Sequence, residues 1–170
     1  DDTIGFDTGG SGSVGRIDTS AVYRDTSAWY NIIFVMDTTN ATATDRQRIY
    51  VNGTRATTTV DVQVGVDFND GLINSANAHE IGTEGAVGSF FDGYMSEVVF
   101  IDGTALDPTS FGEFDEDSGI WKPISVSGLT YGTNGFYLDF ESSGSLGNDA
   151  VGSNNFTVNN LTAIDQTTDT

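Results

Sequence analysis

The densest group of residues that could do chemistry is the acidic run from Glu113 to Asp117, which reads Glu-Phe-Asp-Glu-Asp. Two carboxyl groups can hydrolyse a glycosidic bond with retention when a rigid strand holds them about 5–5.5 Å apart. This run follows a helix start, however, and we interpret it as a solvated acidic turn. His79 is the only histidine, and no nucleophile motif accompanies it. We therefore predict no catalytic residues and no enzyme activity.

Aspartates at the ends of apolar runs are the candidates for a metal site. Asp37 closes one such run, while Asp92 and Asp102 stand just before and just after another. Carboxylate oxygens are hard ligands that suit Ca²⁺ better than zinc. EF-hand spacing is absent, so solvated loop acids are the alternative. We expect calcium, if it binds at Asp37, Asp92 and Asp102, to act on stability more than on chemistry.

Aromatic side chains are the candidates for carbohydrate binding, because the apolar faces of sugar rings pack on tyrosine and tryptophan. Tyr94, Trp121 and Tyr131 are the residues we select for this role. For Trp29 and the phenylalanines we expect packing in the core instead.

Three stretches define the expected framework. Residues 29–36 are aromatic or β-branched almost throughout, which predicts a strand buried on both faces in the middle of a sheet. Residues 48–51 run into Asn52-Gly53, the residue pair of a type I′ turn, so we expect a hairpin with residues 55–59. A second long interior strand is expected over residues 90–101, because both of its faces are largely apolar.

Local patterns also predict one helix and several short strands. Asp107 as N-cap and Pro108 at the first helical position predict a short helix near residues 107–115. Short strands are expected at residues 3–7, 60–66, 79–82, 121–126, 136–141 and 156–161. We assign residues 1–128 to one domain and residues 129–170 to strands and a tail that complete this domain or link it to a neighbour.

Composition excludes several classes of protein. The 25 acidic and 6 basic residues give a formal charge of −19, which repels phosphate backbones and anionic lipids, so we expect neither a nucleic-acid nor a membrane partner. There are no cysteines, so disulfides and thiolate chemistry are excluded. Many glycines and few prolines favour short strands and tight turns. Because the chain begins with Asp1 and runs at once into an expected strand, we interpret it as a piece of a longer or processed polypeptide.

The order of these motifs resembles a known family. The motifs are Trp29, the apolar run, Asp37, a polar loop and Tyr50-Val51-Asn52-Gly53, then Ile81-Gly82, then Phe91-Asp92-Gly93-Tyr94-Met95-Ser96-Glu97-Val98, then Gly103-Thr104-Ala105-Leu106. This order is similar to that of laminin G-like and pentraxin-like domains, a branch of the concanavalin A-like jelly rolls, over residues 20–112. Ser96 stands where the family often has an acidic residue. The resemblance implies an all-β fold, an antiparallel two-sheet β-sandwich of jelly-roll type, which often binds one calcium ion.

Three stretches of the chain, residues 24–32 (RDTSAWYNI), 112–123 (GEFDEDSGIWKP) and 131–140 (YGTNGFYLDF), resemble structural proteins of marine bacteriophages. Together, the phage and jelly-roll resemblances imply three functions that stay open. The first is a non-enzymatic, lectin-like module of a virion or cell surface that self-assembles and binds glycan. The second is a glycan-active hydrolase, since glucanases of this fold carry Glu-x-Asp-x-x-Glu; here Glu113-Phe114-Asp115 begins that way but the third acid is misplaced. The third is a purely structural assembly subunit without a ligand.

The resemblance also implies an open sheet edge. Family members place more strands before the tryptophan than the 28 residues before Trp29 can supply. An unpaired edge is usually covered by a neighbour, so we expect a homo-oligomer or other virion proteins as partners. Residues 136–140 or 156–161 are the candidates to supply that cover from another copy.

Overall fold

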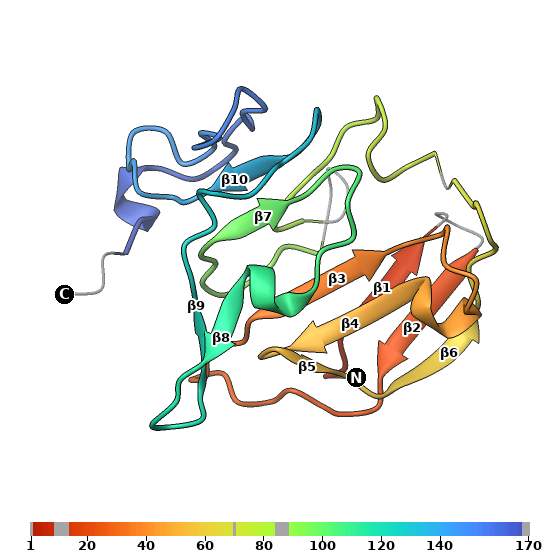
Figure 1. The fold of residues 1–170 in the computed structure, drawn as a ribbon. Coiled ribbons are helices and arrows are strands. Elements are labelled where there is room, and N and C mark those ends of the chain that lie inside the picture. The colour runs from red at the N-terminus through yellow and green to blue at the C-terminus, as the bar shows by residue number, and fades with distance from the viewer. Residues whose placement is uncertain (1, 9–13, 70, 84–88, 168–170) are drawn as a thin grey trace. The chain divides into compact units, whose positions relative to one another are not determined.

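In a computed structural model, which describes residues 2–8, 14–69, 71–83 and 89–167, the chain consists of short antiparallel strands joined by irregular segments (Figure 1). The helices in these ranges are single turns of 3-10 helix. The expected all-β class is therefore confirmed.

The strands are β1 (Gly5–Thr8), β2 (Gly15–Thr19), β3 (Ile32–Met36), β4 (Gln47–Val51), β5 (Thr54–Arg55), β6 (Thr58–Val62), β7 (Val98–Phe100), β8 (Gly112–Phe114), β9 (Trp121–Pro123) and β10 (Phe136–Leu138). The 3-10 turns are η1 (Ala43–Asp45), η2 (Pro108–Ser110) and η3 (Ala163–Asp165).

Contacts within the chain divide it into two compact units. The first unit is Asp1–Asn77 with Ala105–Gly128, and the second is Ala78–Thr104 with Leu129–Thr170. The chain passes from the first unit to the second between Gly128 and Leu129. Residues 78–104 also belong to the second unit. Residues 168–170 of the predicted tail lie outside the described residues.

Two small sheets form most of the first unit, with strand orders β1-β2-β6 and β3-β4-β5. Ile17 of β2 and Ile49 of β4 are 3% and 0% exposed and occupy the core. The rings of Phe6 in β1 and Phe34 in β3 lie 5.2 Å apart between centroids. The side-chain amide of Gln47 donates a hydrogen bond to the carbonyl oxygen of Gly15. These contacts join the two sheets.

The hairpin predicted at Asn52-Gly53 is confirmed. Asn52 and Gly53 have φ angles of 49° and 72°, and a type I′ turn requires positive φ at both central positions. Val51 pairs with Thr54 across the turn. The returning strand is shorter than predicted: β5 ends at Arg55, and the chain then continues into β6, which pairs with β2.

The prediction that residues 29–36 form an interior strand is wrong in its burial and position. β3 spans only Ile32–Met36 and is an edge strand, paired with β4 alone among the described strands. Trp29, Ile32 and Phe34 are 66%, 41% and 48% exposed. Apolar composition predicted the strand correctly, but the number of neighbours depends on long-range pairing, which composition does not determine.

The long strand predicted over residues 90–101 is also shorter in the structure. Only Val98–Phe100 is extended and paired, as β7. Glu97 has a φ of 56° and Ser89 a φ of 54°, and a left-handed residue interrupts a strand. The aromatic side chains before β7 are therefore outside the sheet; Phe90 is 70% exposed.

The helix predicted near residues 107–115 is reduced to the turn η2. Asp107 does cap it, because its carboxylate accepts a hydrogen bond from the backbone N–H of Thr109, and Pro108 follows as predicted. The chain then enters β8, so residues 112–114 are extended instead of helical. The local capping signal was correct, but pairing of β8 with β9 overrides helix propagation.

The second unit is built on the two-stranded sheet of β7 and β10. Phe100 and Phe136 face each other across it, with stacked rings 5.6 Å apart, and Phe156 meets Phe136 edge-on at 4.8 Å. Leu138 is 2% exposed. The strands predicted at residues 79–82 and 156–161 are not formed, although the N–H of Phe156 donates to the carbonyl oxygen of Gly147.

We predict that Gly53→Ala lowers the free energy of unfolding by about 2–4 kcal/mol, because it combines left-handed strain with a steric clash. A Cβ atom at position 53 would stand 2.2 Å from Cε3 of Trp121. The matched control is Gly128→Ala, where a Cβ atom would meet nothing within 4 Å. Denaturant unfolding monitored by tryptophan fluorescence measures both; equal stabilities of the two variants would contradict the prediction.

Candidate functional site

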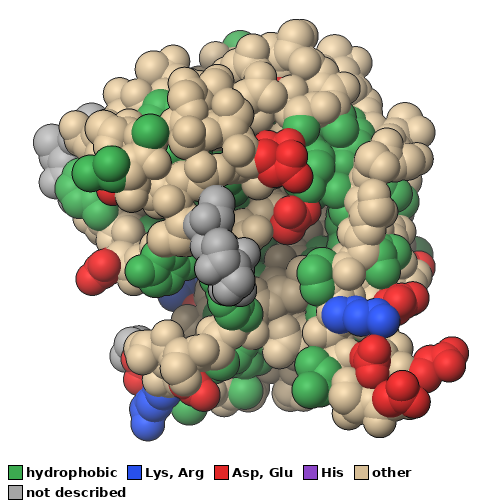
Figure 2. Space-filling view, turned by 90° about the vertical axis from the view of Figure 1, so that its left-hand side faces the viewer, with side chains coloured by type: hydrophobic (Ala, Val, Ile, Leu, Met, Phe, Trp, Pro, Cys, Tyr) green, Lys and Arg blue, Asp and Glu red, His purple; other side chains and the backbone are tan. Residues whose placement is uncertain are grey.

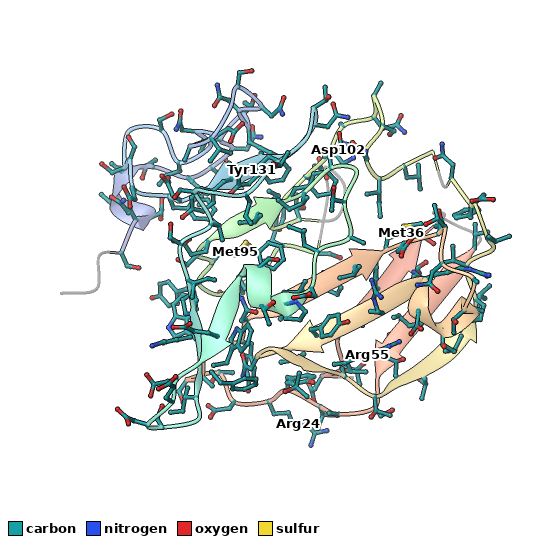
Figure 3. All side chains as sticks on the ribbon, viewed as in Figure 1. Arg24, Met36, Arg55, Met95, Asp102 and Tyr131 are labelled. Atoms are coloured by element: carbon teal, nitrogen blue, oxygen red, sulfur yellow. The ribbon has the colours of Figure 1, made fainter. Side chains whose placement is uncertain are left out.

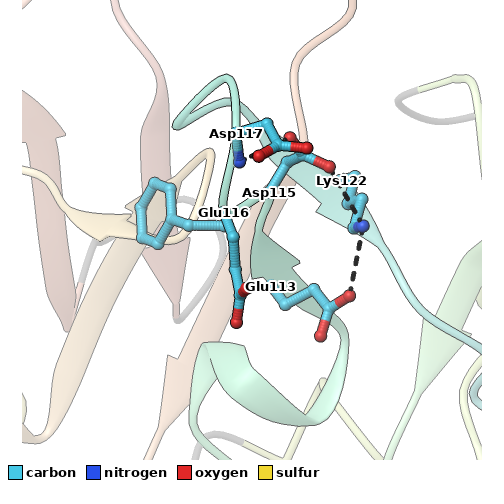
Figure 4. A pocket seen from close by; sticks show the side chains of 6 residues that line it. Glu113, Asp115, Glu116, Asp117 and Lys122 are labelled. Atoms are coloured by element: carbon cyan, nitrogen blue, oxygen red, sulfur yellow. Dashed lines mark hydrogen bonds and ion pairs between the residues drawn. The ribbon is translucent and has the colours of Figure 1, made fainter.

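The acidic run selected from the sequence lies on the β8–β9 hairpin of the first unit. Glu113 and Lys122 are directly opposite each other in the register of this hairpin. They line an open hollow of about 320 Å³ together with Phe114, Asp115, Glu116 and Asp117 (Figure 4). Ligand pockets are lined mostly by apolar side chains, whereas all the residues that line this hollow except Phe114 are charged.

Two carboxylates of the hollow, those of Glu113 and Asp115, form ion pairs with Lys122. Its ammonium nitrogen lies 3.4 Å from a carboxylate oxygen of Glu113 and 3.2 Å from Oδ2 of Asp115 (Figure 4). The other oxygen of Asp115 accepts hydrogen bonds from the N–H and hydroxyl groups of Ser118, both at 2.9 Å. Asp115 thus closes the turn between β8 and β9.

The electrostatics of Asp115 do not suit acid catalysis. Hydrogen bonds from the backbone and hydroxyl of Ser118, followed by the contact with Lys122, hold the pKa of Asp115 below its usual range. A glycosidase acid needs a raised pKa so that it keeps its proton near neutral pH. The geometry therefore agrees with an acidic turn that binds its own backbone.

The three aspartates selected for calcium are divided between the two units, Asp37 in the first and Asp92 and Asp102 in the second. Thr39 donates its hydroxyl to Asp37, which is the main reason that the pKa of Asp37 is lowered. The carboxylate of Asp102 accepts from the N–H of Asn134. Within the described ranges no three acidic, histidine or cysteine side chains form a group that could hold a metal. Calcium binding at these aspartates stays a prediction.

Trp121, one of the three aromatic candidates, is used for packing. Its indole N–H donates to Oδ1 of Asn31 at 3.2 Å, and its ring meets Phe114 edge-on at 5.0 Å. The ring also lies against Gly53 and Gly112, where a Cβ atom would stand within 2.5 Å of it. Both of these close approaches thus depend on glycine. The ring of Trp121 thus packs the β8–β9 hairpin against the β4–β5 turn.

The other two aromatic candidates differ in exposure. Tyr94 is 69% exposed and lies in the aromatic loop, residues 90–95, beside Phe90 and Phe91. Tyr131 is buried, and its carbonyl oxygen accepts from the N–H of Asp102, so these residues lie side by side in the second unit (Figure 3). Of the three, only Tyr94 presents a largely free ring to a ligand.

Two tyrosines and an acid form a cluster in the second unit that the sequence did not reveal. The hydroxyl of Tyr137 donates to the carboxylate of Glu97. Burial, followed by this hydrogen bond, raises the pKa of Tyr137 well above its usual value. Burial and the charges of Asp149 and Glu97 raise the pKa of Tyr131 as well. The raised pKa values favour the protonated form of both hydroxyls.

Asp149 is the most deeply buried acid among the described residues, at 4% exposed. Its Oδ1 accepts from the backbone N–H groups of Tyr137 and Val151, and its Oδ2 from that of Asn154. Burial raises its pKa, but these hydrogen bonds lower it by more, and the net pKa lies below the usual value. Asp149 is therefore ionised and fixes the loop after residue 147 against β10. The sequence signal would have been an Asp within a Gly/Ser/Asn-rich loop.

Comparisons of the chain with protein-family models, curated proteins and solved structures found no match. Its function is therefore inferred from its own residues.

We predict that Asp149→Ala lowers the free energy of unfolding at pH 7 by about 2–3 kcal/mol, because three backbone N–H donors lose the carboxylate that accepts their hydrogen bonds. The pKa of Asp149 is lower in the folded state than in the unfolded state. The stability that its carboxylate contributes is therefore complete above the unfolded-state pKa of about 3.9, and it is lost as the pH falls through the folded-state pKa. The difference in free energy of unfolding between wild type and Asp149→Ala should thus disappear in acid. Denaturant titrations at several pH values measure it, with the exposed Asp92→Ala as control. A gap that is independent of pH would contradict this role.

Proposed function

We propose that this chain is a non-enzymatic structural module of a virion or cell surface that works by assembling with further copies of itself. The observation that carries the proposal is the open apolar edge of β3, where Trp29, Ile32 and Phe34 are all more than 40% exposed. Large apolar side chains beside an unpaired strand are a template for association with another chain. The proposal includes the case of a purely structural subunit that binds no ligand.

The proposed scaffold is a concanavalin A-like jelly roll with two sheets packed face to face. The contact of Phe6 with Phe34 and that of Gln47 with Gly15 support it, because each joins β1-β2-β6 to β3-β4-β5. In a sandwich the inner faces of both sheets alternate with outer polar residues. β2 has this alternation: Ile17 is buried, whereas Arg16 and Asp18 are partly exposed and pair with each other.

The charge of the chain supports a protein partner over nucleic acid. Figure 2 shows acidic side chains spread over the face that it presents, with hydrophobic side chains reaching the surface among them. A net charge of −19 repels the phosphate backbone. None of the helices in the described part of the chain has the length or hydropathy to cross a membrane.

Self-assembly should be visible in sedimentation velocity as a rise in the average sedimentation coefficient with protein concentration in the micromolar range. Copies that each carry a charge of −19 repel one another, and salt screens this repulsion, since the Debye length falls from about 10 Å at 0.1 M to about 3 Å at 1 M ionic strength. We therefore expect stronger association at high salt. A monomer at every concentration, in low and in high salt, would refute the proposal.

Glycan binding is a second candidate function, favoured by the exposed ring of Tyr94 in the aromatic loop. Stacking on a sugar requires the ring but not the hydroxyl. On a glycan array, we expect that Tyr94→Ala loses binding at least about tenfold, a change of about 1.4 kcal/mol, while Tyr94→Phe keeps it. Absence of binding by the wild type, or equal binding by both variants, would remove Tyr94 from this role and leave the assembly proposal untouched.

A further inference from the structure

The unpaired edge of β3 follows from its hydrogen bonds to β4. The N–H of Asp37 donates to the carbonyl oxygen of Arg46, and the N–H of Asn52 donates to that of Asn31. In an antiparallel pair, alternate residues direct both backbone groups toward the partner strand. The residues between these bonds that face β4 are Ile33 and Val35. The N–H and C=O groups of Ile32, Phe34 and Met36 therefore point away from β4, where no described strand pairs with them.

β3 is also unlike the other strands in composition. Of the described strands of four or more residues, β3 alone has no charged residue and no glycine or proline. Charged residues are the usual protection of an exposed edge. The charged residues of the other long strands are Asp7 in β1, Arg16 and Asp18 in β2, Arg48 in β4 and Asp61 in β6.

We propose that β3 pairs with β3 of a second copy, antiparallel and about a two-fold axis at Phe34, so that one sheet runs through both copies. This inference rests on the proposed self-assembly and identifies its surface and partner. A two-fold contact brings the same strand of both copies together. Because Ile32, Phe34 and Met36 already point their backbone groups outward, all three can bond to the second strand without any change of register.

The charges agree with this register. With Phe34 opposite Phe34 of the second copy, Ile32 faces Met36 of the second copy, and Asp37 faces its Asn31. Like charges directly opposite each other destabilise a strand pair, and here the acid at the strand end meets a neutral amide. In a chain of charge −19, β3 thus offers five successive residues along which two copies can approach without an ion of like sign.

A single cysteine tests the pairing, because the chain has none of its own. Directly opposite, hydrogen-bonded residues have Cα atoms about 5.5 Å apart, within the range of about 4.4–6.8 Å that a disulfide spans. Under mild oxidation we expect Phe34→Cys to form a covalent dimer. The matched control is Val22→Cys, since Val22 is 47% and Phe34 48% exposed. Equal cross-linking of the two variants would overturn the assignment.

A charge swap tests the register and does not depend on the contact of Phe34 with Phe6. Ile32→Asp and Met36→Lys, made singly, should each raise the dissociation constant of the dimer about tenfold or more, because each buries a charge without a partner. In the double variant the carboxylate introduced at position 32 faces the ammonium introduced at position 36 of the second copy, and most of the affinity should return. Single variants that associate like wild type, or a double variant no better than the singles, would overturn the inference.

The outcomes separate this inference from the proposed function. Concentration-dependent sedimentation of the wild type, together with failure of both the cross-link and the charge swap, would leave self-assembly standing and place it elsewhere. A wild type that stays monomeric under every condition would overturn both. A β3 edge protected from hydrogen exchange in the dilute monomer would overturn the inference, because the edge would then be covered within one chain.

Discussion

The packing of Trp121 against the Asn52-Gly53 turn is the contact on which the arrangement of strands in the first unit depends. The indole N–H bonds to Asn31, and the backbone N–H of Asn31 in turn bonds to Oδ1 of Asn52. Three segments far apart in the sequence meet there: the start of β3, the β4–β5 turn and the β8–β9 hairpin. The ring can approach closely only because Gly53 and Gly112 have no side chain. One aromatic residue thereby orients the edge strand on which the proposed assembly relies.

Several acids bind backbone groups, and one of them is Asp115 of the acidic run that was considered for catalysis. Asp107, Asp115, Asp149 and Asp165 each accept hydrogen bonds from N–H groups within turns. A fold of short strands leaves many N–H groups without a ladder partner, and a carboxylate satisfies them well. The acidic composition is therefore partly explained by turn chemistry. These acids also give the chain a large net negative charge. Because like charges repel, two copies can approach only through surfaces that carry few acids.

Features determined by neighbouring residues could be predicted from the sequence, and features determined by distant ones could not. The Asn52-Gly53 turn and the Asp107 cap were found because their chemistry is local. The burial of β3, the loss of strand over residues 90–97 and the burial of Tyr131 depend on which segments pair, and hydrophobic patterns do not contain that information. Asp149 was missed for the same reason: its donors include Tyr137, twelve positions away in the sequence.

The proposed edge pairing through β3 implies that association stops at two copies. A sheet grows into a fibre when both of its edges accept strands. The opposite edge of this sheet is β5, which has only two residues, Thr54 and Arg55, and short charged edges resist pairing. Arg55 is held there by Asp45, with 2.7 Å between the guanidinium and carboxylate atoms. A two-fold contact pairs the apolar β3 edge of each copy, so the β5 strands form the two remaining edges of the joined sheet. Repulsion between the acidic surfaces opposes the addition of further copies.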